Sequence, residues 1–277
     1  MNSAQLSVTV SRPNSRRWTI LGLAIASAAM PIVLALFNRL RLPWTTTNIL
    51  LREAVLFGIA GGLLLLIRQG EGLGWESVGL QRPALVKTAL WVLITLILLI
   101  IAAALAFGMI KLLGWPVGRN SAHSYDLLPT WVVAIVILRA GFIEELYYRG
   151  YMIERLQMLT GSRLVAAGLP LFVFAICHYE QGWAGITIAL FTGAVLSGAY
   201  MYKRNLWITI IAHFLVDFIP NIVVPLLSCL SWKWRKRSSV KIAERTYEKG
   251  TKALHRRGEG GHSEAAPIGQ GSGLGLV

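Results

Sequence analysis

Four ionisable side chains lie within apolar stretches of this sequence: the adjacent carboxylates Glu144 and Glu145, and the imidazoles His178 and His213. Ionisable side chains are costly inside a bilayer, and those found there usually face a functional cavity. A carboxylate or an imidazole can take a proton from water directly, or can hold a metal ion that activates the water. The four residues together therefore indicate a catalytic or ion-handling centre within the membrane.

Glu144 and Glu145 are adjacent and so point in different directions. Glu145 and Arg149 are four residues apart, so on a helix they share a face and can form an ion pair. Glu144 points about 100° away from that face. This spacing predicts that Arg149 neutralises and orients Glu145, while Glu144 acts as a general base toward water. The alternative is a charged helix end at the level of the lipid headgroups, because Tyr147 and Tyr148 lie close by.

The two histidines also have neighbours at helical spacing. His213 and Asp217 are four residues apart, as are Phe174 and His178. The carboxylate of Asp217 can hold the imidazole of His213 in one tautomer, or both groups can reach one ligand. Three polar segments of this kind predict one shared site.

Other charged residues in apolar segments have weaker claims to a role in chemistry. Arg139 could partner Glu144 or a substrate carboxylate, but local charge balance is the simpler role. Arg52 and Glu53 are adjacent and so do not face one another on a helix, which predicts that they extend separately to the headgroups. Sequences typical of nucleotide-binding loops, zincins or serine hydrolases are not found.

The composition predicts an all-α, polytopic transmembrane helical bundle of 7–8 helices. Hydrophobic residues make up 55% of the 277 residues and charged residues only 14%, whereas soluble domains average about a quarter charged. Apolar stretches that could cross a ~30 Å hydrocarbon core occupy 18–37, 49–67, 88–110, a segment that begins at Thr130, 164–178, 183–202 and 206–230.

Three parts are expected along the chain. Residues 1–17 form a basic cytoplasmic N-terminus, residues 18–231 a transmembrane domain, and residues 232–277 a basic, Gly-rich tail predicted to be disordered. Basic segments prefer the cytoplasm, and two cytoplasmic ends require an even number of crossings, which favours a break near Pro220. The net charge of +14 is explained by contact of the tail with anionic lipid headgroups rather than with nucleic acid.

The three polar segments also match known motifs. Glu144-Glu-Leu-Tyr-Tyr-Arg149 matches EExxxR, Phe174-Ala-Ile-Cys-His178 matches FxxxH, and His213-Phe-Leu-Val-Asp217 matches Hxxx[N/D]. In this order and at these separations they resemble the CPBP family of intramembrane proteases, also called the Abi or CAAX-protease family. The family includes eukaryotic CAAX prenyl endopeptidases and bacterial proteins linked to bacteriocin processing or immunity. The resemblance covers roughly residues 70 to 220.

The resemblance implies an endopeptidase, in the plasma membrane of a bacterium, that cleaves a membrane-embedded or lipidated peptide or protein. Glu144 with His178 would activate water, and His213 with Asp217 would stabilise the oxyanion. Family members are described both as metalloproteases and as metal-independent glutamate proteases, so Glu144, His178 and His213 are also possible Zn²⁺ ligands. No cofactor-binding residue beyond these is implied.

One residue departs from the family pattern. The prenyl-protein enzymes typically carry Asn where this chain has Asp217, and an ionised Asp cannot donate a hydrogen bond to an oxyanion. Asp217 must therefore be protonated, orient His213 or bind a metal.

A site that contains both Glu144 and His178 also constrains the length of the fourth helix. Glu144 and His178 can meet at mid-depth only if this helix continues past Arg149 or if residues 150–163 carry part of the crossing. The polar residues 154–163 would then form the turn. Two other functions remain open from the sequence: an ion- or proton-coupled transporter, and a non-catalytic immunity or scaffold protein.

Overall fold

A computed structural model describes residues 15–116 and 128–227 of the chain. The chain divides into a unit of residues Met1–Val224 and a second unit, Pro225–Val277. The described part of the first unit contains all the helices discussed below, and residues 225–227 are the described part of the second. The terminal segment 1–14 and the predicted tail at 232–277 lie outside the described residues.

The described residues are helical and contain no strand, so the predicted all-α fold is confirmed. Seven long helical segments occur among them, and five are long and apolar enough to cross a membrane, which identifies an integral membrane protein. The outer faces of these helices carry exposed apolar side chains, as at Leu98 and Ile101. A lipid-facing surface accounts for such exposure, because hydrocarbon can cover those faces.

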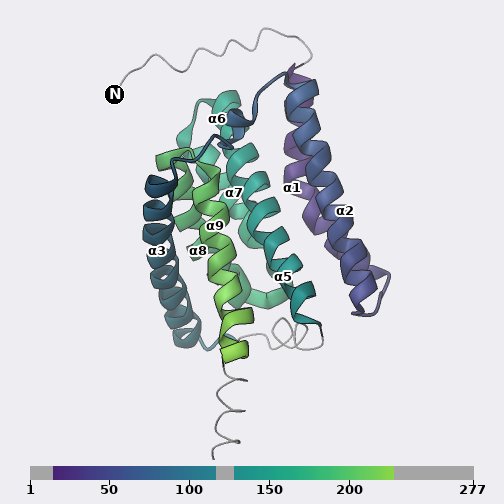
Figure 1. Cartoon of the computed structure of the whole chain (residues 1–277), viewed down its shortest axis with the longest axis vertical. Helices are drawn as coiled ribbons and strands as arrows, with labels where there is room; N and C mark the ends of the chain where they lie inside the picture. Colours follow the sequence, from purple (N-terminus) through teal and green to yellow (C-terminus); the bar gives the residue numbers. More distant parts are fainter. Residues whose placement is uncertain (1–14, 117–127, 228–277) are drawn as a thin grey trace, which may run out of the picture. The chain divides into compact units, whose positions relative to one another are not determined.

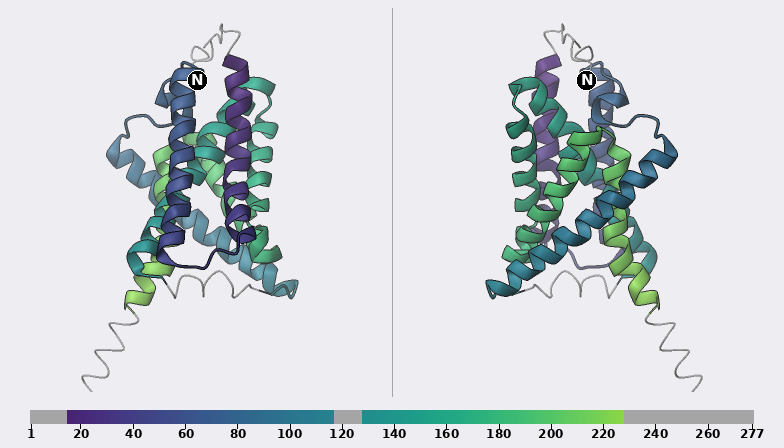
Figure 2. Two further views of the ribbon diagram at one scale, coloured as in Figure 1. Left: turned by 90° about the vertical axis from the view of Figure 1, so that its right-hand side faces the viewer. Right: turned by 90° about the vertical axis from the view of Figure 1, so that its left-hand side faces the viewer.

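The first three helices lie within the N-terminal part of the chain. They are α1 (Ser15–Arg39), α2 (Thr46–Leu65, extended by η1, Leu66–Gly70) and α3 (Leu85–Leu112). The hydroxyl of Thr45 accepts a hydrogen bond from the backbone N–H of Asn48 and caps α2. Helix α2 packs against α1, and α3 packs against α8 (Gly182–Lys203) and α9 (Leu206–Phe218). Figure 2 shows α3, in blue, running obliquely across the bundle.

The fourth long segment is one continuous helix with a wide middle. It consists of α5 (Thr130–Arg139), the π-helix η3 (Ala140–Ile153) and α6 (Glu154–Thr160). It ends at Gly161, which adopts a left-handed conformation with φ 67°, and Ser162 caps the next helix, α7 (Arg163–Ile176). The helix therefore continues past Arg149, as expected, but the predicted turn at 154–163 is wrong in extent: residues 154–160 are helical, and only Gly161 and Ser162 form the turn. Because this helix turns back into α7 (Figure 1), their motifs can lie at a similar depth.

The predicted break near Pro220 is wrong. The helix that begins at Leu206 continues to Leu227 as one candidate span, with a π-helical segment, η5 (Ile219–Val223), around the proline. Proline lacks a backbone N–H, and a local widening of the helix accommodates the missing hydrogen bond. The described segments therefore number seven rather than eight, and the cytoplasmic location of the N-terminus remains a prediction.

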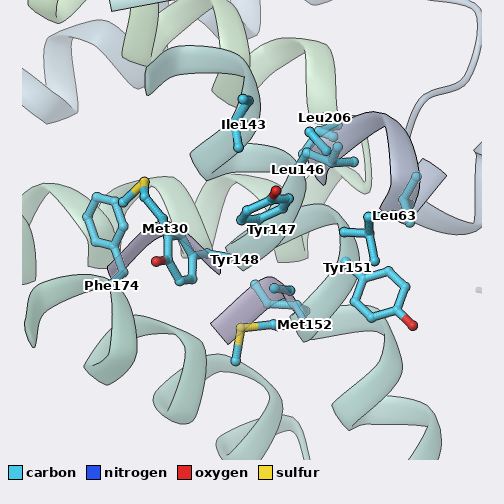
Figure 3. Close-up of a cluster of buried hydrophobic side chains, with 14 of the residues drawn as sticks. Met30, Leu63, Ile143, Leu146, Tyr147, Tyr148, Tyr151, Met152, Phe174 and Leu206 are labelled. Carbon is cyan, nitrogen blue, oxygen red and sulfur yellow. The ribbon is translucent and has the colours of Figure 1, made fainter. Parts of the chain in front are cut away.

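The wide helix η3 lies at the centre of the core. Its residues Tyr147, Tyr148 and Tyr151 are fully buried, and Figure 3 shows them clustered with Met30 and Phe174. This part of the helix is therefore packed inside protein, and the alternative of tyrosines at a headgroup-level helix end is not what the structure shows. π-Helical segments occur frequently at functional sites, and η3 carries the EExxxR motif.

Candidate active site

The first and third motifs meet at a single carboxylate oxygen. Oε1 of Glu145 lies 2.6 Å from Nη1 of Arg149 and 2.8 Å from Nδ1 of His213. The predicted ion pair between Glu145 and Arg149 is therefore present, and it joins η3 to α9. The two helices approach closely at Gly141, where an added Cβ would lie 3.1 Å from the backbone nitrogen of Phe214. A larger residue at position 141 would therefore separate the elements that bring Glu145 and His213 together.

Arg149 joins three helices at the centre of the site. Its Nη2 donates to the carbonyl oxygen of Gly193 on α8 at 3.2 Å, and its guanidinium lies 4.2 Å from the ring centroid of Phe174 on α7. A desolvated guanidinium over an aromatic face is a favourable cation–π contact. Arg149 is fully buried, so its charge is balanced within the protein by Glu145.

Phe174 is the residue on which all three motifs converge. Its ring contacts that of His178 at 4.9 Å between centroids and that of His213 at 6.3 Å, both edge to face. The ring of Tyr148 meets it in the same way at 5.3 Å. The sequence marked Phe174 only by its distance from His178, so its role as the shared surface of both imidazoles was missed. The FxxxH spacing was the signal available for it.

His178 is held in one tautomer. Its Nδ1 lies 2.9 Å from the carbonyl oxygen of Phe174, and because a carbonyl can only accept, Nδ1 carries the hydrogen. In the neutral ring, Nε2 is then an acceptor with a free lone pair. The imidazole is half-buried and follows the end of α7, where Glu180 of the next turn accepts a hydrogen bond from Asn38 of α1.

His213 lies between two carboxylates. Its Nδ1 faces Glu145, and its Nε2 lies 3.5 Å from Oδ2 of Asp217. The contact with Asp217 is at the long end for an ion pair, and the side chain of Asp217 is 39% exposed. Of the roles open to Asp217, the structure shows the orienting contact with His213.

Glu144 is engaged by Arg139, one of the two partners that the sequence left open for this arginine. Its Oε1 accepts a hydrogen bond from Nη1 of Arg139 at 2.7 Å, and no hydrogen bond within the described segments involves Oε2. Glu144 also lies close enough to Tyr148 and Cys177 for its charge to act on both. The Sγ of Cys177 is 3.3 Å from the hydroxyl of Tyr148, and His178 follows Cys177 in the chain. Cys177 thus lies near Glu144 and precedes His178, but no direct contact between Glu144 and His178 occurs among the described residues.

Arg52 and Glu53 do not extend separately to the headgroups. Both are buried, and Arg52 donates two hydrogen bonds to Oε1 of Glu53, at 2.9 and 2.7 Å. Oε2 of Glu53 accepts from Nε of Arg139 at 2.8 Å. Arg52 and Glu53 can pair although they are adjacent, because a long arginine side chain can fold back onto its neighbour. We call the series Arg52–Glu53–Arg139–Glu144 the charge chain.

The possible zinc ligands do not form a metal site in this structure. Among the described residues, no three His, Cys, Asp or Glu side chains gather in a way that could hold a metal ion. Both nitrogens of His213 face carboxylates, and Glu144 is engaged by the cationic Arg139. The arrangement therefore does not fit a zinc ion held by Glu144, His178 and His213.

Comparison with known proteins agrees with the motifs. Residues 126–219 match the family described as Type II CAAX prenyl endopeptidase Rce1-like. All three motifs lie inside this segment, which covers about a third of the chain. The resemblance to the CAAX-protease family is thereby confirmed, although the matched segment begins later than residue 70. Searches among curated proteins and among solved structures give no match.

Proposed function

We propose that this chain, which matches the type II CAAX prenyl endopeptidases over residues 126–219, is an intramembrane endopeptidase. The reaction is hydrolysis of a peptide bond in a membrane-associated or lipidated substrate. The convergence of the three motifs around Phe174 is the observation that carries the proposal. A single ring in contact with both imidazoles and with Arg149 brings the ionisable groups of three helices into one site.

Glu144 and His178 are the groups that activate water. Oε2 of Glu144 and Nε2 of His178 both carry lone pairs that can accept a proton. A water between them would lose a proton to Glu144 as its oxygen attacks the carbonyl carbon of the substrate. When the C–N bond breaks, the same proton passes to the leaving amine, which is general acid–base catalysis by one group in both directions.

His213 is the group that stabilises the developing oxyanion. As an imidazolium it carries a positive charge and an N–H at Nε2, and the long 3.5 Å separation from Asp217 leaves that N–H able to turn toward a substrate oxygen. Asp217 then orients His213 rather than donating a hydrogen bond itself. Glu145 and Arg149 hold the imidazolium in place and need not touch the substrate.

The location of the site and the matched family support one substrate class. Buried groups within apolar helices reach peptides that are themselves in or at the bilayer, and the matched family is described by its action on prenylated CAAX sequences. We therefore propose peptides with a lipidated C-terminal region as the first class to test. An unlipidated membrane peptide of the same sequence is the matched comparison.

The test is product analysis with the purified protein in liposomes. Cleavage is followed by mass spectrometry on the lipidated and unlipidated peptides in water enriched in ¹⁸O. The proposal predicts new termini with ¹⁸O in the new carboxylate, and faster cleavage of the lipidated peptide. Folded protein that cleaves neither peptide, nor any member of a broad membrane-peptide library, would instead favour a non-catalytic membrane protein.

A further inference from the structure

The charge chain extends beyond the segment that matches the family. Its members Arg52 and Glu53 belong to α2, whereas Arg139 and Glu144 belong to α5 and η3. Glu53 is only 2% exposed, and each of its carboxylate oxygens contacts a different arginine. A buried carboxylate with both oxygens engaged is rigidly held, and here it is held against the cation that contacts Glu144.

Among the described residues, Arg139 contacts two carboxylates, and it uses a different nitrogen for each. Nε donates to Glu53 at 2.8 Å, and Nη1 donates to Glu144 at 2.7 Å. Since a guanidinium is planar and its donors have a fixed geometry, the bond at Nε fixes the direction from which Nη1 reaches Glu144. Without that bond, Arg139 could turn and engage both oxygens of Glu144 in a bidentate pair, which is the stronger arrangement.

The charges of the four residues alternate and sum to zero. Arg52 balances Glu53, and Arg139 balances Glu144, all at 8% exposure or less. A buried ion pair is tolerated when its partners satisfy one another, and removal of one partner leaves an uncompensated charge. Charge balance of Glu144 alone would need only Arg139. Arg52 and Glu53 on α2 are therefore not needed to neutralise Glu144, which indicates that they have another role.

We propose that Glu53 is a positioning residue for the reaction at Glu144 and acts through Arg139. By holding Nε of Arg139, Glu53 limits that arginine to one hydrogen bond with Glu144 and leaves Oε2 of Glu144 for the attacking water. This inference rests on the proposed peptidase function. It gives α2, which lies outside the segment that matches the family, a role in orienting the catalytic carboxylate of Glu144.

The matched control is a second buried Glu–Arg pair. Glu71 accepts three hydrogen bonds from Arg155, the shortest at 2.7 Å, and both residues are buried. This pair also joins the N-terminal helices to the fourth long helix, at α6, but it has no contact with the charge chain among the described residues. Glu71→Gln therefore measures the effect on folding of removing a buried carboxylate that does not contact the charge chain.

The experiment compares kcat and KM for peptide cleavage by Glu53→Gln, Arg139→Gln and the double variant, each corrected for folded protein. We expect Glu53→Gln to lower kcat by about 10- to 100-fold, as for a slightly misplaced catalytic group, with KM unchanged. In the Arg139→Gln background the same substitution should change kcat less than about twofold, because Glu53 then has nothing to act through. Glu71→Gln should keep the wild-type kcat.

If Glu53→Gln fails to fold, Arg52→Gln/Glu53→Gln removes the outer pair together and keeps the buried charge balanced. An unchanged kcat in the folded Glu53→Gln or paired variant would overturn the inference, as would additive effects of Glu53→Gln and Arg139→Gln. An equal fall in kcat for Glu71→Gln would also overturn it. Failure of the proposed function looks different, because wild-type protein would then show no cleavage at all.

Discussion

Nδ1 of His213 lies 2.8 Å from Oε1 of Glu145, although 68 residues separate the two along the chain. The same oxygen accepts from Arg149 at 2.6 Å. One carboxylate thus holds two cationic groups from two helices in fixed positions. Because Glu145 holds Nδ1 of His213, only Nε2 can be directed at a substrate, and the proposed mechanism gives that N–H an electrostatic role.

Replacement of Glu145 by Gln should destabilise the protein strongly. The amide cannot balance the charge of buried Arg149, and an uncompensated buried charge costs about 3–5 kcal/mol. We expect a large fall in the thermal unfolding midpoint in detergent, together with loss of cleavage. Glu154→Gln is the control, because Glu154 pairs with the half-exposed Arg204 and such pairs contribute at most about 1 kcal/mol. Equal midpoints for the two variants would contradict the assigned role of Glu145.

Replacement of Phe174 by Leu should impair activity more than stability. Leucine keeps most of the buried apolar volume but removes the ring that contacts Arg149 and both imidazoles. The lost aromatic and cation–π contacts are worth about 1–3 kcal/mol, while kcat should fall at least tenfold because the imidazoles lose their common support. Phe172→Leu on the same helix is the control, since Phe172 is 61% exposed. An unchanged kcat in Phe174→Leu would refute the central position of the ring.

Asp217→Asn should be tolerated. The asparagine oxygen can still accept from Nε2 of His213, and the exposed position of Asp217 makes the loss of charge inexpensive. We expect cleavage within about tenfold of wild type and little change in the unfolding midpoint. Asp217→Leu, which removes the acceptor, should lower activity further. Complete inactivity of Asp217→Asn would show that its carboxylate takes part in the chemistry.

Gly193→Ala should be destabilising although alanine is the better helix former. An added Cβ would lie 2.8 Å from Cδ1 of Leu171 and 2.9 Å from Cδ1 of Phe174, and overpacking of this kind costs about 1–3 kcal/mol. Gly198→Ala on the same helix meets nothing within 4 Å and should be neutral or slightly stabilising. The unfolding midpoints of the two variants, compared with wild type, provide the test.

The long-range apolar pattern and the spaced motifs were sufficient to predict much of this protein. The helices could be located because runs of apolar residues the length of a bilayer have few alternative structures. The pair of Glu145 and Arg149 could be predicted because it depends only on local spacing. The continuation of the fourth helix past Arg149 followed from the requirement that Glu144 and His178 meet.

The charge chain could not be predicted, since its partners come from different helices. Adjacent Arg52 and Glu53 gave no indication that Glu53 would meet Arg139, a contact that spans 86 residues. The helix through Pro220 was missed for another reason: a π-helical turn absorbs the proline locally, and this widening leaves no clear mark in the sequence. Tertiary packing determines the first feature, and local backbone geometry determines the second.

The most direct test of the account is the initial rate of peptide cleavage by Glu144→Gln relative to wild type, in the same liposomes and at equal amounts of folded protein. Because Glu144 is assigned as the general base, the rate should fall by about 10²- to 10⁴-fold, while the unfolding midpoint stays close to that of wild type. Cleavage by Glu144→Gln at the wild-type rate would contradict the assignment and place the chemistry elsewhere.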